Sequence, residues 1–303
     1  MDTILSKLVQ FFLVLLLGVW LAKVKMISEQ SLRLLSQLVT KAFLPAFTFC
    51  SMYIGNSRKQ LSDGVPVLFI TFFFYLSIML LFALLSKIIG IKEERQRTFQ
   101  ALFIFGNTGF IGFPIIQSLY GGEGTIYMAL FSVVDQLILW SYGVWLCSSR
   151  GRGKFQVKNL LNPCMVAIIA AISFLLADIH IPKIFLDSAA SVGNANTGVC
   201  MIYLGALLYY SNLRFVLKEK ELYIGIAVKM LVLPICVHLL FSNFVPNTVM
   251  RGTLVMLSAL PTMTVIPILV KNGSSEGEYA AGVTMVTLIA SLVTLPVVAY
   301  LAL

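Results

Sequence analysis

Apolar stretches follow one another along nearly the whole chain, and this pattern most constrains what the chain can fold into. A helix that crosses a bilayer needs about 20 predominantly apolar residues. Ten windows meet that requirement, at residues 4–22, 31–53, 64–88, 96–119, 123–148, 160–179, 184–211, 221–243, 248–271 and 277–302. The loops between them are short, so we expect an all-α integral membrane protein without a folded soluble domain.

The composition agrees with this expectation and excludes other classes of protein. Of the 303 residues, 59% are apolar and 12% are charged, whereas soluble domains average about 25% charged residues. The net charge of +9 does not indicate nucleic acid, because the basic residues lie between apolar stretches rather than in one patch. The five cysteines are scattered singly, without metal-binding or redox spacing. We therefore expect the lipid bilayer as a partner, with no nucleic acid, metal or cofactor bound.

The distribution of Lys and Arg predicts the orientation of the chain. With ten spans, 14 of the 22 basic residues fall in loops on one side and five on the other, while three lie within spans. The positive-inside rule places the richer side in the cytoplasm. We expect a multi-pass protein of the plasma membrane with both termini outside. No small-residue cleavage site follows the first window, which is therefore expected to remain as the first span.

Five spans precede the basic loop and five follow it, so the two halves enter the membrane from opposite sides. This arrangement predicts a 5+5 inverted-topology repeat. A shift of 153 residues aligns Pro114 with Pro267. The expected parts are a first five-helix repeat at 1–148, a basic cytoplasmic linker at 149–159 and a second five-helix repeat at 160–303.

The segment FGNTGFIGFP (105–114) interrupts the fourth span with three glycines, an asparagine and a proline. An unpaired backbone group in lipid costs several kcal/mol, so such breaks occur only inside protein or beside a watery cavity. The ninth span contains a corresponding break, LSALPTMTVIP (257–267). Paired breaks in two inverted halves are typical of a transporter binding site. We expect helices 4 and 9 to be broken and to cross; a simple proline kink is the alternative for the ninth span.

Each break creates a helix N-terminus, whose free N–H groups favour an anion. Gly109 and Gly112 let a substrate approach the backbone, and Asn107 adds hydrogen-bonding groups. Pro114 and Pro267 are expected to open the second half of each broken helix, because a first helical residue needs no N–H. The expected substrate-binding residues are Asn107, Thr108, Gly109, Gly112, Pro114, Pro261, Thr262, Thr264 and Pro267.

Two charged residues are expected at membrane depth. Asp135 is the one acid there, and burial favours its neutral form, which predicts an ion-coupling role as a proton carrier. The alternative is a structural, hydrogen-bonded aspartate paired with Lys229. Lys229 lies about 12 Å along the eighth span and is a candidate contact for an anion. It could instead pair with Asp135 or extend to the cytoplasmic surface.

Several motifs resemble the auxin efflux carrier family. GNTGFIGFPIIQSLYG (106–121) resembles its Asn-x-Gly-x-x-Gly-x-Pro segment, and ALPTMTVIPILVKNG (259–273) resembles its C-terminal end. KAFLPAFTF (41–49) and KMLVLPI (229–235) are similar to its second and eighth spans. The resemblance implies a ten-span inverted repeat related to bile-acid:sodium symporters. Spans one, two, six and seven would form a scaffold, and the other six spans would form a moving transport domain. The departures are Gly198, where many relatives carry proline, and the lack of a long cytoplasmic loop.

The resemblance also implies a carrier function. Plant members export auxin, an organic acid, and bacterial members are associated with carboxylates such as malate or malonate. The sequence has no P-loop, and His180 and His238 lie too far apart in the chain for metal-ligand spacing, so neither ATP-driven transport nor an enzyme is expected. We predict a secondary transporter of small organic anions that works by alternating access and is coupled to protons or sodium. The alternatives are a passive channel or uniporter and a sodium-coupled bile-acid-like symporter. A homodimer is a further expectation.

Overall fold

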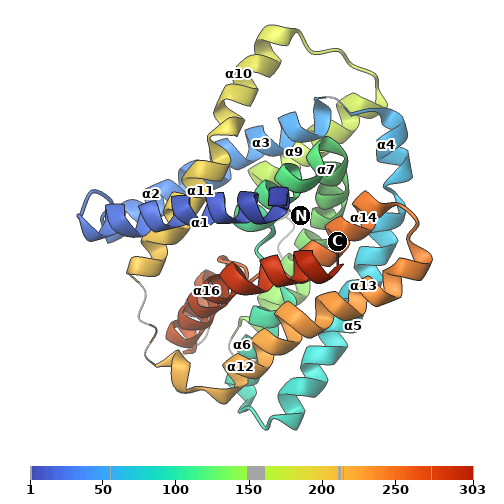
Figure 1. Ribbon diagram of the computed structural model, residues 1–303. Coiled ribbons are helices and arrows are strands. Elements are labelled where there is room, and N and C mark those ends of the chain that lie inside the picture. Colours follow the sequence, from blue (N-terminus) through green and yellow to red (C-terminus); the bar gives the residue numbers. More distant parts are fainter. Residues whose placement is uncertain are drawn as a thin grey trace. The chain divides into compact units, whose positions relative to one another are not determined.

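The computed structural model is built of helices joined by short loops (Figure 1). It describes residues 2–54, 56–148, 161–210, 213, 215–273 and 275–302. Within this part, helical segments coincide with all ten predicted spans. The predicted linker at 149–159 lies outside the described residues.

Helical segments of the first half follow the five predicted spans in order. They are α1 (Asp2–Lys23), α2 (Glu29–Leu38), η1 (Val39–Phe43), α3 (Leu44–Tyr53), α4 (Arg58–Asp63), α5 (Pro66–Ile88), α6 (Glu93–Ile104), η2 (Thr108–Gly112), α7 (Phe113–Ile138), η3 (Leu139–Gly143) and α8 (Val144–Leu146). A kink at Gly121, which has a φ of 62°, divides α7 where the fourth span was predicted to end. Glycine tolerates this positive φ without a steric penalty.

The second half shows the same correspondence. Its segments are α9 (Pro163–Leu176), α10 (Lys183–Asn194), α11 (Asn196–Tyr209), η6 (Val216–Lys218), α12 (Lys220–Ala227), η7 (Val228–Val232), α13 (Leu233–Phe244), α14 (Thr248–Ser258), α15 (Ile266–Gly273) and α16 (Gly277–Ala302). Local chemistry sets several of their ends. The side chain of Asn162 accepts the Met165 N–H at 3.0 Å at the start of α9, and Asn247 caps α14 in the same way.

Three π-helical segments precede prolines inside predicted spans, namely η1, η2 and η7. In η1 the chain reads VTKAF before Pro45, and in η7 it reads VKMLV before Pro234. Proline has no N–H, and its ring clashes with the preceding turn of an α-helix. A single wider turn avoids that clash while the span continues, and such turns are frequent at functional sites.

The apolar helices identify an integral membrane protein. In the described part, five stretches are long and apolar enough to cross a membrane, namely Glu29–Tyr53, Arg58–Ile88, Thr108–Leu146, Lys220–Phe244 and Gly277–Tyr300. Val9–Lys23 and Pro163–Leu176 are shorter apolar helices. The count of ten spans and the inverted repeat remain predictions.

The chain forms two compact units, each assembled from separate segments. Unit 1 comprises Met1–Pro66, Gly109–Leu130 and Leu161–Tyr210, and unit 2 comprises Val67–Thr108, Phe131–Leu160 and Ser211–Leu303. Unit 1 therefore contains the four spans that the resemblance assigns to a scaffold. Unit 2 contains most of the six spans that the resemblance assigns to a transport domain. The exception is Gly109–Leu130, which includes parts of the fourth and fifth spans and belongs to unit 1.

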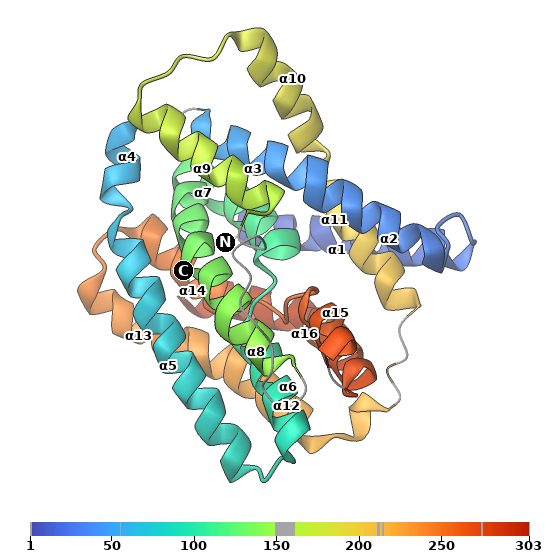
Figure 2. The ribbon, with the colours of Figure 1, turned by 180° about the vertical axis from the view of Figure 1, so that it is seen from behind.

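Unit 1 is held together by close helix packing. Helices α1 and α11 lie against each other (Figure 1), and α3 contacts both α9 and α10 (Figure 2). A side chain at Gly205 would overlap the backbone of Leu15, and one at Gly18 would overlap Ile202. Small residues at such positions allow helix backbones to approach closely in a membrane.

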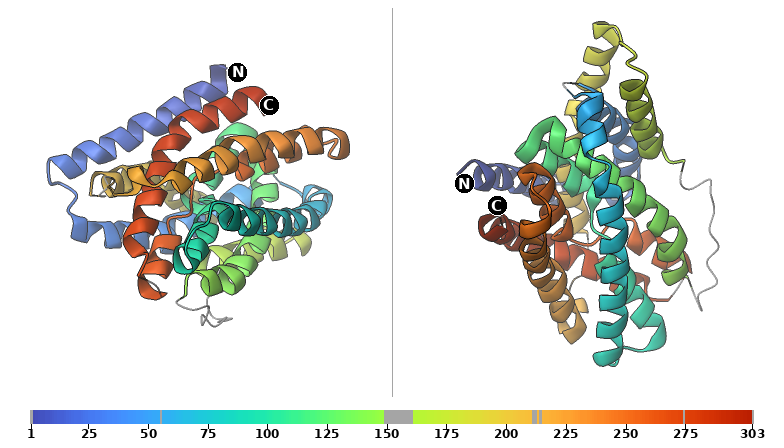
Figure 3. Two further views of the ribbon diagram at one scale, coloured as in Figure 1. Left: turned by 90° about the horizontal axis from the view of Figure 1, so that it is seen from below. Right: turned by 90° about the vertical axis from the view of Figure 1, so that its right-hand side faces the viewer.

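In unit 2, α13 and α14 form a helical hairpin, drawn in orange in Figure 3. Helix α16 contacts α6, α13, α14 and α15. Aromatic rings fill the space around α6, where the ring centroids of Phe99 and Phe103 are 4.9 Å apart and Phe82 stacks on Phe103. The close packing of these helices positions the breaks described next.

Candidate functional site

The two predicted breaks meet inside unit 2. Between α6 and η2, the extended segment 105–107 runs antiparallel to residues 261–263, between α14 and α15. The N–H of Asn107 donates to the Pro261 carbonyl oxygen at 2.7 Å, and the N–H of Met263 donates to the Phe105 oxygen at 3.1 Å. Each segment thus satisfies backbone groups that the other leaves unpaired. We call these two paired segments the crossover.

The ninth span is broken rather than kinked. Helix α14 ends at Ser258 and α15 begins at Ile266, with non-helical backbone between them. A kink alone would have left the helix continuous, so that alternative is wrong. The predicted interruptions of helices 4 and 9 are confirmed, and the interrupted segments pair in unit 2. That the two helices cross stays a prediction.

Glycine at position 106 allows the two segments to approach. A Cβ atom there would lie 3.0 Å from Leu260 Cβ, closer than normal packing allows. On the other segment, the Thr262 N–H donates to Thr287 Oγ1 of α16 at 3.2 Å. The Thr262 hydroxyl is buried and has no hydrogen-bond partner among the described residues, so a polar atom of the crossover is available to a ligand.

The second halves of the broken helices begin differently. Pro267 is the second residue of α15, as predicted for a proline that opens a helix. Pro114 is likewise the second residue of α7, but the five-residue π-helix η2 precedes it. Helical backbone therefore resumes at Thr108 rather than at Pro114.

The structure divides the predicted substrate-binding residues between the two units. Unit 2 contains Asn107, Thr108, Pro261, Thr262, Thr264 and Pro267, together with Asp135 and Lys229. Unit 1 contains Gly109, Gly112 and Pro114. In unit 1, Phe110 stacks on Tyr203 with ring centroids 5.2 Å apart. A role for the nine predicted residues in substrate binding stays a prediction.

Asp135 is fully buried and accepts hydrogen bonds from three side chains. The Tyr75 hydroxyl donates to Oδ1, while Gln136 Nε2 and Thr108 Oγ1 donate to Oδ2 at 3.3 and 3.4 Å. A buried carboxylate needs such partners to offset the loss of water. Because Thr108 follows the crossover directly, one hydrogen bond connects Asp135 with the crossover. The structural role left open by the sequence is compatible with this geometry, and so is ion coupling.

Lys229 is also buried, with 3% of its surface exposed. Its ammonium therefore does not extend to the surface, and that alternative is wrong. The Nζ atom lies 5.7 Å from the centroid of the Phe74 ring, within the range of a cation–π interaction. Lys229 interacts electrostatically with Asp135, but among the described residues no carboxylate lies within 4.0 Å of its ammonium.

Several members of this polar cluster were not predicted. Tyr75 follows three phenylalanines in the third span, and its hydroxyl was the available signal, because a buried tyrosine usually has a hydrogen-bond partner. Gln136 neighbours Asp135 in the chain and could have been found from that position. The contacts of Phe74 and Thr287 depend on how their helices are rotated, which the sequence pattern does not reveal.

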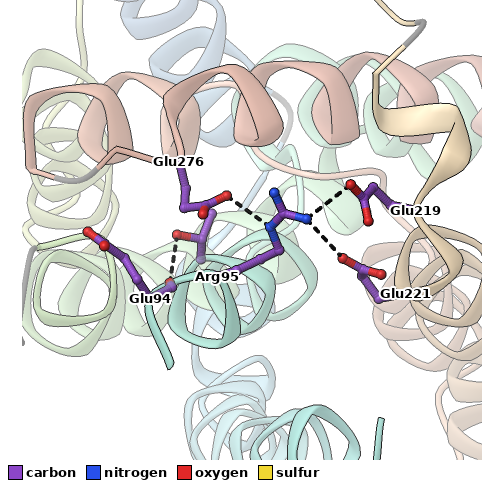
Figure 4. Close-up of polar contacts among 6 residues, drawn as sticks. Glu94, Arg95, Glu219, Glu221 and Glu276 are labelled. Atoms are coloured by element: carbon purple, nitrogen blue, oxygen red, sulfur yellow. Dashed lines mark hydrogen bonds and ion pairs between the residues drawn. The ribbon is translucent and has the colours of Figure 1, made fainter. Parts of the chain in front are cut away.

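A second charged cluster surrounds Arg95, near the start of α6 (Figure 4). Its guanidinium lies 3.0 Å from a carboxylate oxygen of both Glu219 and Glu276, and 3.7 Å from Glu221. The Tyr279 ring centroid is 4.7 Å from its central carbon. Burial alone would lower the pKa of Arg95, but Glu276, followed by Glu219, raises that pKa above its ordinary value.

The Arg95 cluster joins the beginnings of three helices of unit 2. Glu219 precedes α12, Glu276 precedes α16, and Arg95 lies in the first turn of α6. Carboxylates are favourable at helix N-termini, and the arginine offsets part of their mutual repulsion. Helices α6 and α16 lead from this cluster to the crossover, so the cluster fixes their position relative to each other.

Known proteins that are similar to this chain are named as transporters. The family model described as membrane transport protein matches residues 3–299. An uncharacterized transporter of Methanocaldococcus jannaschii is 26% identical over 225 residues, which cover 71% of each chain. An uncharacterized transporter of Methanothermobacter thermautotrophicus is 23% identical and covers 97% of this chain and 96% of the relative. The uncharacterized transporter YfdV of Escherichia coli K12 is 21% identical, over 85% of this chain and 84% of its own.

Proposed function

The chain belongs to the membrane transport protein family, the family of the auxin efflux carriers, and from this premise we propose that it is a secondary transporter of small organic anions. It moves its substrate by alternating access, with unit 2 as the mobile part and unit 1 as the scaffold. The family and the relatives named as transporters make it a membrane transporter. The substrate class and the coupling ion are our proposal.

The crossover is the observation that carries the proposal. Its two segments interrupt apolar helices and pair with each other through the backbone of residues 105–107 and 261–263. Such an arrangement has a cost in folding that a purely structural helix bundle avoids, and it is typical of transporter binding sites. The second of these segments contains the Thr262 hydroxyl, which has no hydrogen-bond partner in the described part of the chain.

An organic anion fits the charges around the crossover. Helical backbone resumes after each break, at Thr108 and at Ile266, and the first N–H groups of such segments carry partial positive charge. Lys229 adds a full positive charge in the same unit. Small carboxylates have the size and the charge for this environment.

A proton gradient is the proposed driving force, with Asp135 as the carrier of the proton. Asp135 is buried and reaches the crossover through the Thr108 hydroxyl. Sodium is the second candidate, because non-helical backbone carbonyls at a crossover can coordinate it. A passive uniporter or channel and a bile-acid-like sodium symporter are the alternative functions.

We extend the proposal to the location and the partners of the protein. The protein lies in the plasma membrane with both termini outside, and it needs no cofactor other than its coupling ion. A homodimer through unit 1 would leave unit 2 free to move. No nucleic acid takes part.

The decisive experiment is uptake of radiolabelled malate and lactate into liposomes that contain the purified protein. A pH gradient and a sodium gradient are imposed separately. Accumulation above equilibrium with the pH gradient supports a proton-coupled carrier, and accumulation with sodium alone supports the second candidate. Equilibration without accumulation under either gradient would establish a passive uniporter. Asn107→Ala should abolish uptake while the variant remains folded and inserted, because it removes a polar side chain of the crossover.

A further inference from the structure

We propose that Asp135 and Lys229 form a charge-balanced pair in which one proton on Asp135 releases the charge of Lys229 for one substrate carboxylate. The inference rests on the proposed function and adds the stoichiometry to it. One proton enters with one carboxylate group, so a monocarboxylate crosses the membrane without net charge.

The charges of Asp135 and Lys229 balance each other. Asp135 and Lys229 are buried in unit 2, with exposed fractions of 0% and 3%. The groups that face Asp135 from other helices are the Tyr75 hydroxyl of α5, the Thr108 hydroxyl of η2 and the charge of Lys229 of η7. The ring beside Lys229 is that of Phe74. The two full charges sum to zero.

Electrostatics links the binding of a proton to the binding of an anion in this buried region. A carboxylate that enters alone would leave this buried region with one net negative charge, which is unfavourable in a medium of low dielectric constant. A proton that binds Asp135 alone would leave Lys229 without a countercharge. When both bind, the neutral Asp135, the positive Lys229 and the negative substrate again sum to zero. Proton and anion therefore favour each other's binding.

The ammonium of Lys229 is accessible to the carboxylate of a ligand. Among the described residues, Lys229 has no carboxylate within 4.0 Å, although it interacts electrostatically with Asp135. Its ammonium is therefore not committed to a direct contact with Asp135. A substrate carboxylate can approach it without first breaking a short salt bridge.

Thr108 supplies the physical link to the crossover. Its hydroxyl now donates to Asp135 Oδ2 at 3.4 Å. Once a proton is bound to that oxygen, the carboxylic acid donates and the Thr108 oxygen accepts, since a hydroxyl can do either. The Thr108 proton is then free to point to a ligand, so protonation creates a new donor next to the crossover.

Infrared difference spectroscopy of the ligand-free protein tests the pair without requiring transport. At neutral pH, Lys229→Met should show a protonated carboxylic-acid band that the wild type lacks. The band should disappear in the double variant Lys229→Met with Asp135→Asn, which assigns it to Asp135. Lys41→Met is the matched control, because Lys41 lies in a π-helical segment ahead of a proline but is exposed. Identical spectra of the single and double variants, or the band already present in the wild type, would overturn the proposal.

Transport by the wild type gives a second test that needs no variant. In liposomes, a carrier that moves one net negative charge per substrate should accumulate about 50-fold more substrate when an inside-positive potential of about 100 mV is imposed. We expect this increase for malate, which carries two carboxylates, and no change for lactate, which carries one. Lactate accumulation that follows the potential, or malate accumulation that does not, overturns the stoichiometry. If neither compound accumulates under a pH gradient or a sodium gradient, the proposed function fails, whereas the infrared result still decides the pair.

Discussion

The N–H of Asn107 and the carbonyl oxygen of Pro261 are 2.7 Å apart, and this hydrogen bond joins two breaks that lie far apart in the sequence. It explains how an apolar helix can be interrupted at membrane depth. The backbone groups freed by one break are satisfied by the other, together with the Met263–Phe105 bond and the Thr287 hydroxyl. Both breaks are therefore needed for either to be stable.

Gly106→Ala should weaken the crossover. The new Cβ would lie 3.0 Å from Leu260 Cβ, and overpacking of this kind costs about 1–3 kcal/mol. We expect a lower Tm of the purified protein and strongly reduced uptake. Gly198→Ala is the matched control, because its Cβ would meet no atom within 4 Å and alanine favours a helix. Equal behaviour of the two variants would mean that close approach at position 106 is unimportant.

Arg95→Met should destabilise unit 2. It removes the cation that Glu219, Glu221 and Glu276 share, and their side-chain exposures are 25%, 12% and 19%. Partly exposed ion pairs contribute less than buried ones, so we expect a loss of about 1–3 kcal/mol in the free energy of unfolding.

A double-mutant cycle checks the Arg95 prediction. Adding Glu276→Gln to Arg95→Met should cost less than the sum of the two single changes, because the repulsion is partly removed. Arg58→Met, at an exposed arginine of α4, should leave the free energy of unfolding nearly unchanged. Strict additivity in the cycle would show that the two residues do not interact energetically.

Asp135→Asn should uncouple transport from the proton gradient. The amide keeps the shape of the side chain but cannot take up and release a proton. We expect the variant to exchange labelled for unlabelled substrate across liposomes, yet not to concentrate it when a pH gradient is imposed. Full proton-driven accumulation by this variant would make Asp135 a structural residue.

Neutral analogues of a transported acid should compete poorly. The helix N-termini and Lys229 favour a negative charge, and hydrogen bonds to charged groups are stronger than neutral ones. Lactamide and methyl lactate should inhibit lactate uptake at least about tenfold more weakly than unlabelled lactate, a difference of about 1.4 kcal/mol. Equal inhibition by acid, ester and amide would contradict the proposed recognition of charge.

The predicted orientation can be checked by labelling single cysteines in a cysteine-free background. A membrane-impermeant thiol reagent should modify His180→Cys in intact cells and Gly153→Cys only after the membrane is opened. The reason is the excess of basic residues on the side of residue 153. Labelling of position 153 from outside would reverse the topology.

Local properties of the sequence were sufficient to predict the helices and the breaks. The length of an apolar stretch indicates a span, a proline has no N–H to donate, and glycine permits close backbone approach. The positions of the helical regions, of the interruption at 105–107 and of Pro267 in the first turn of α15 therefore follow from the order of residues. The family resemblance rested on the same segments.

The partners across the fold were decided by the tertiary structure. Hydropathy locates a helix but does not determine its rotation, so the hydroxyl of Tyr75 on Asp135 and the burial of Lys229 could not be predicted. The same holds for the three glutamates around Arg95, of which Glu219 and Glu221 lie at the start of α12 and Glu276 directly precedes α16. Polar side chains in an apolar span can reach a partner in several directions, and the packing of neighbouring helices selects among them.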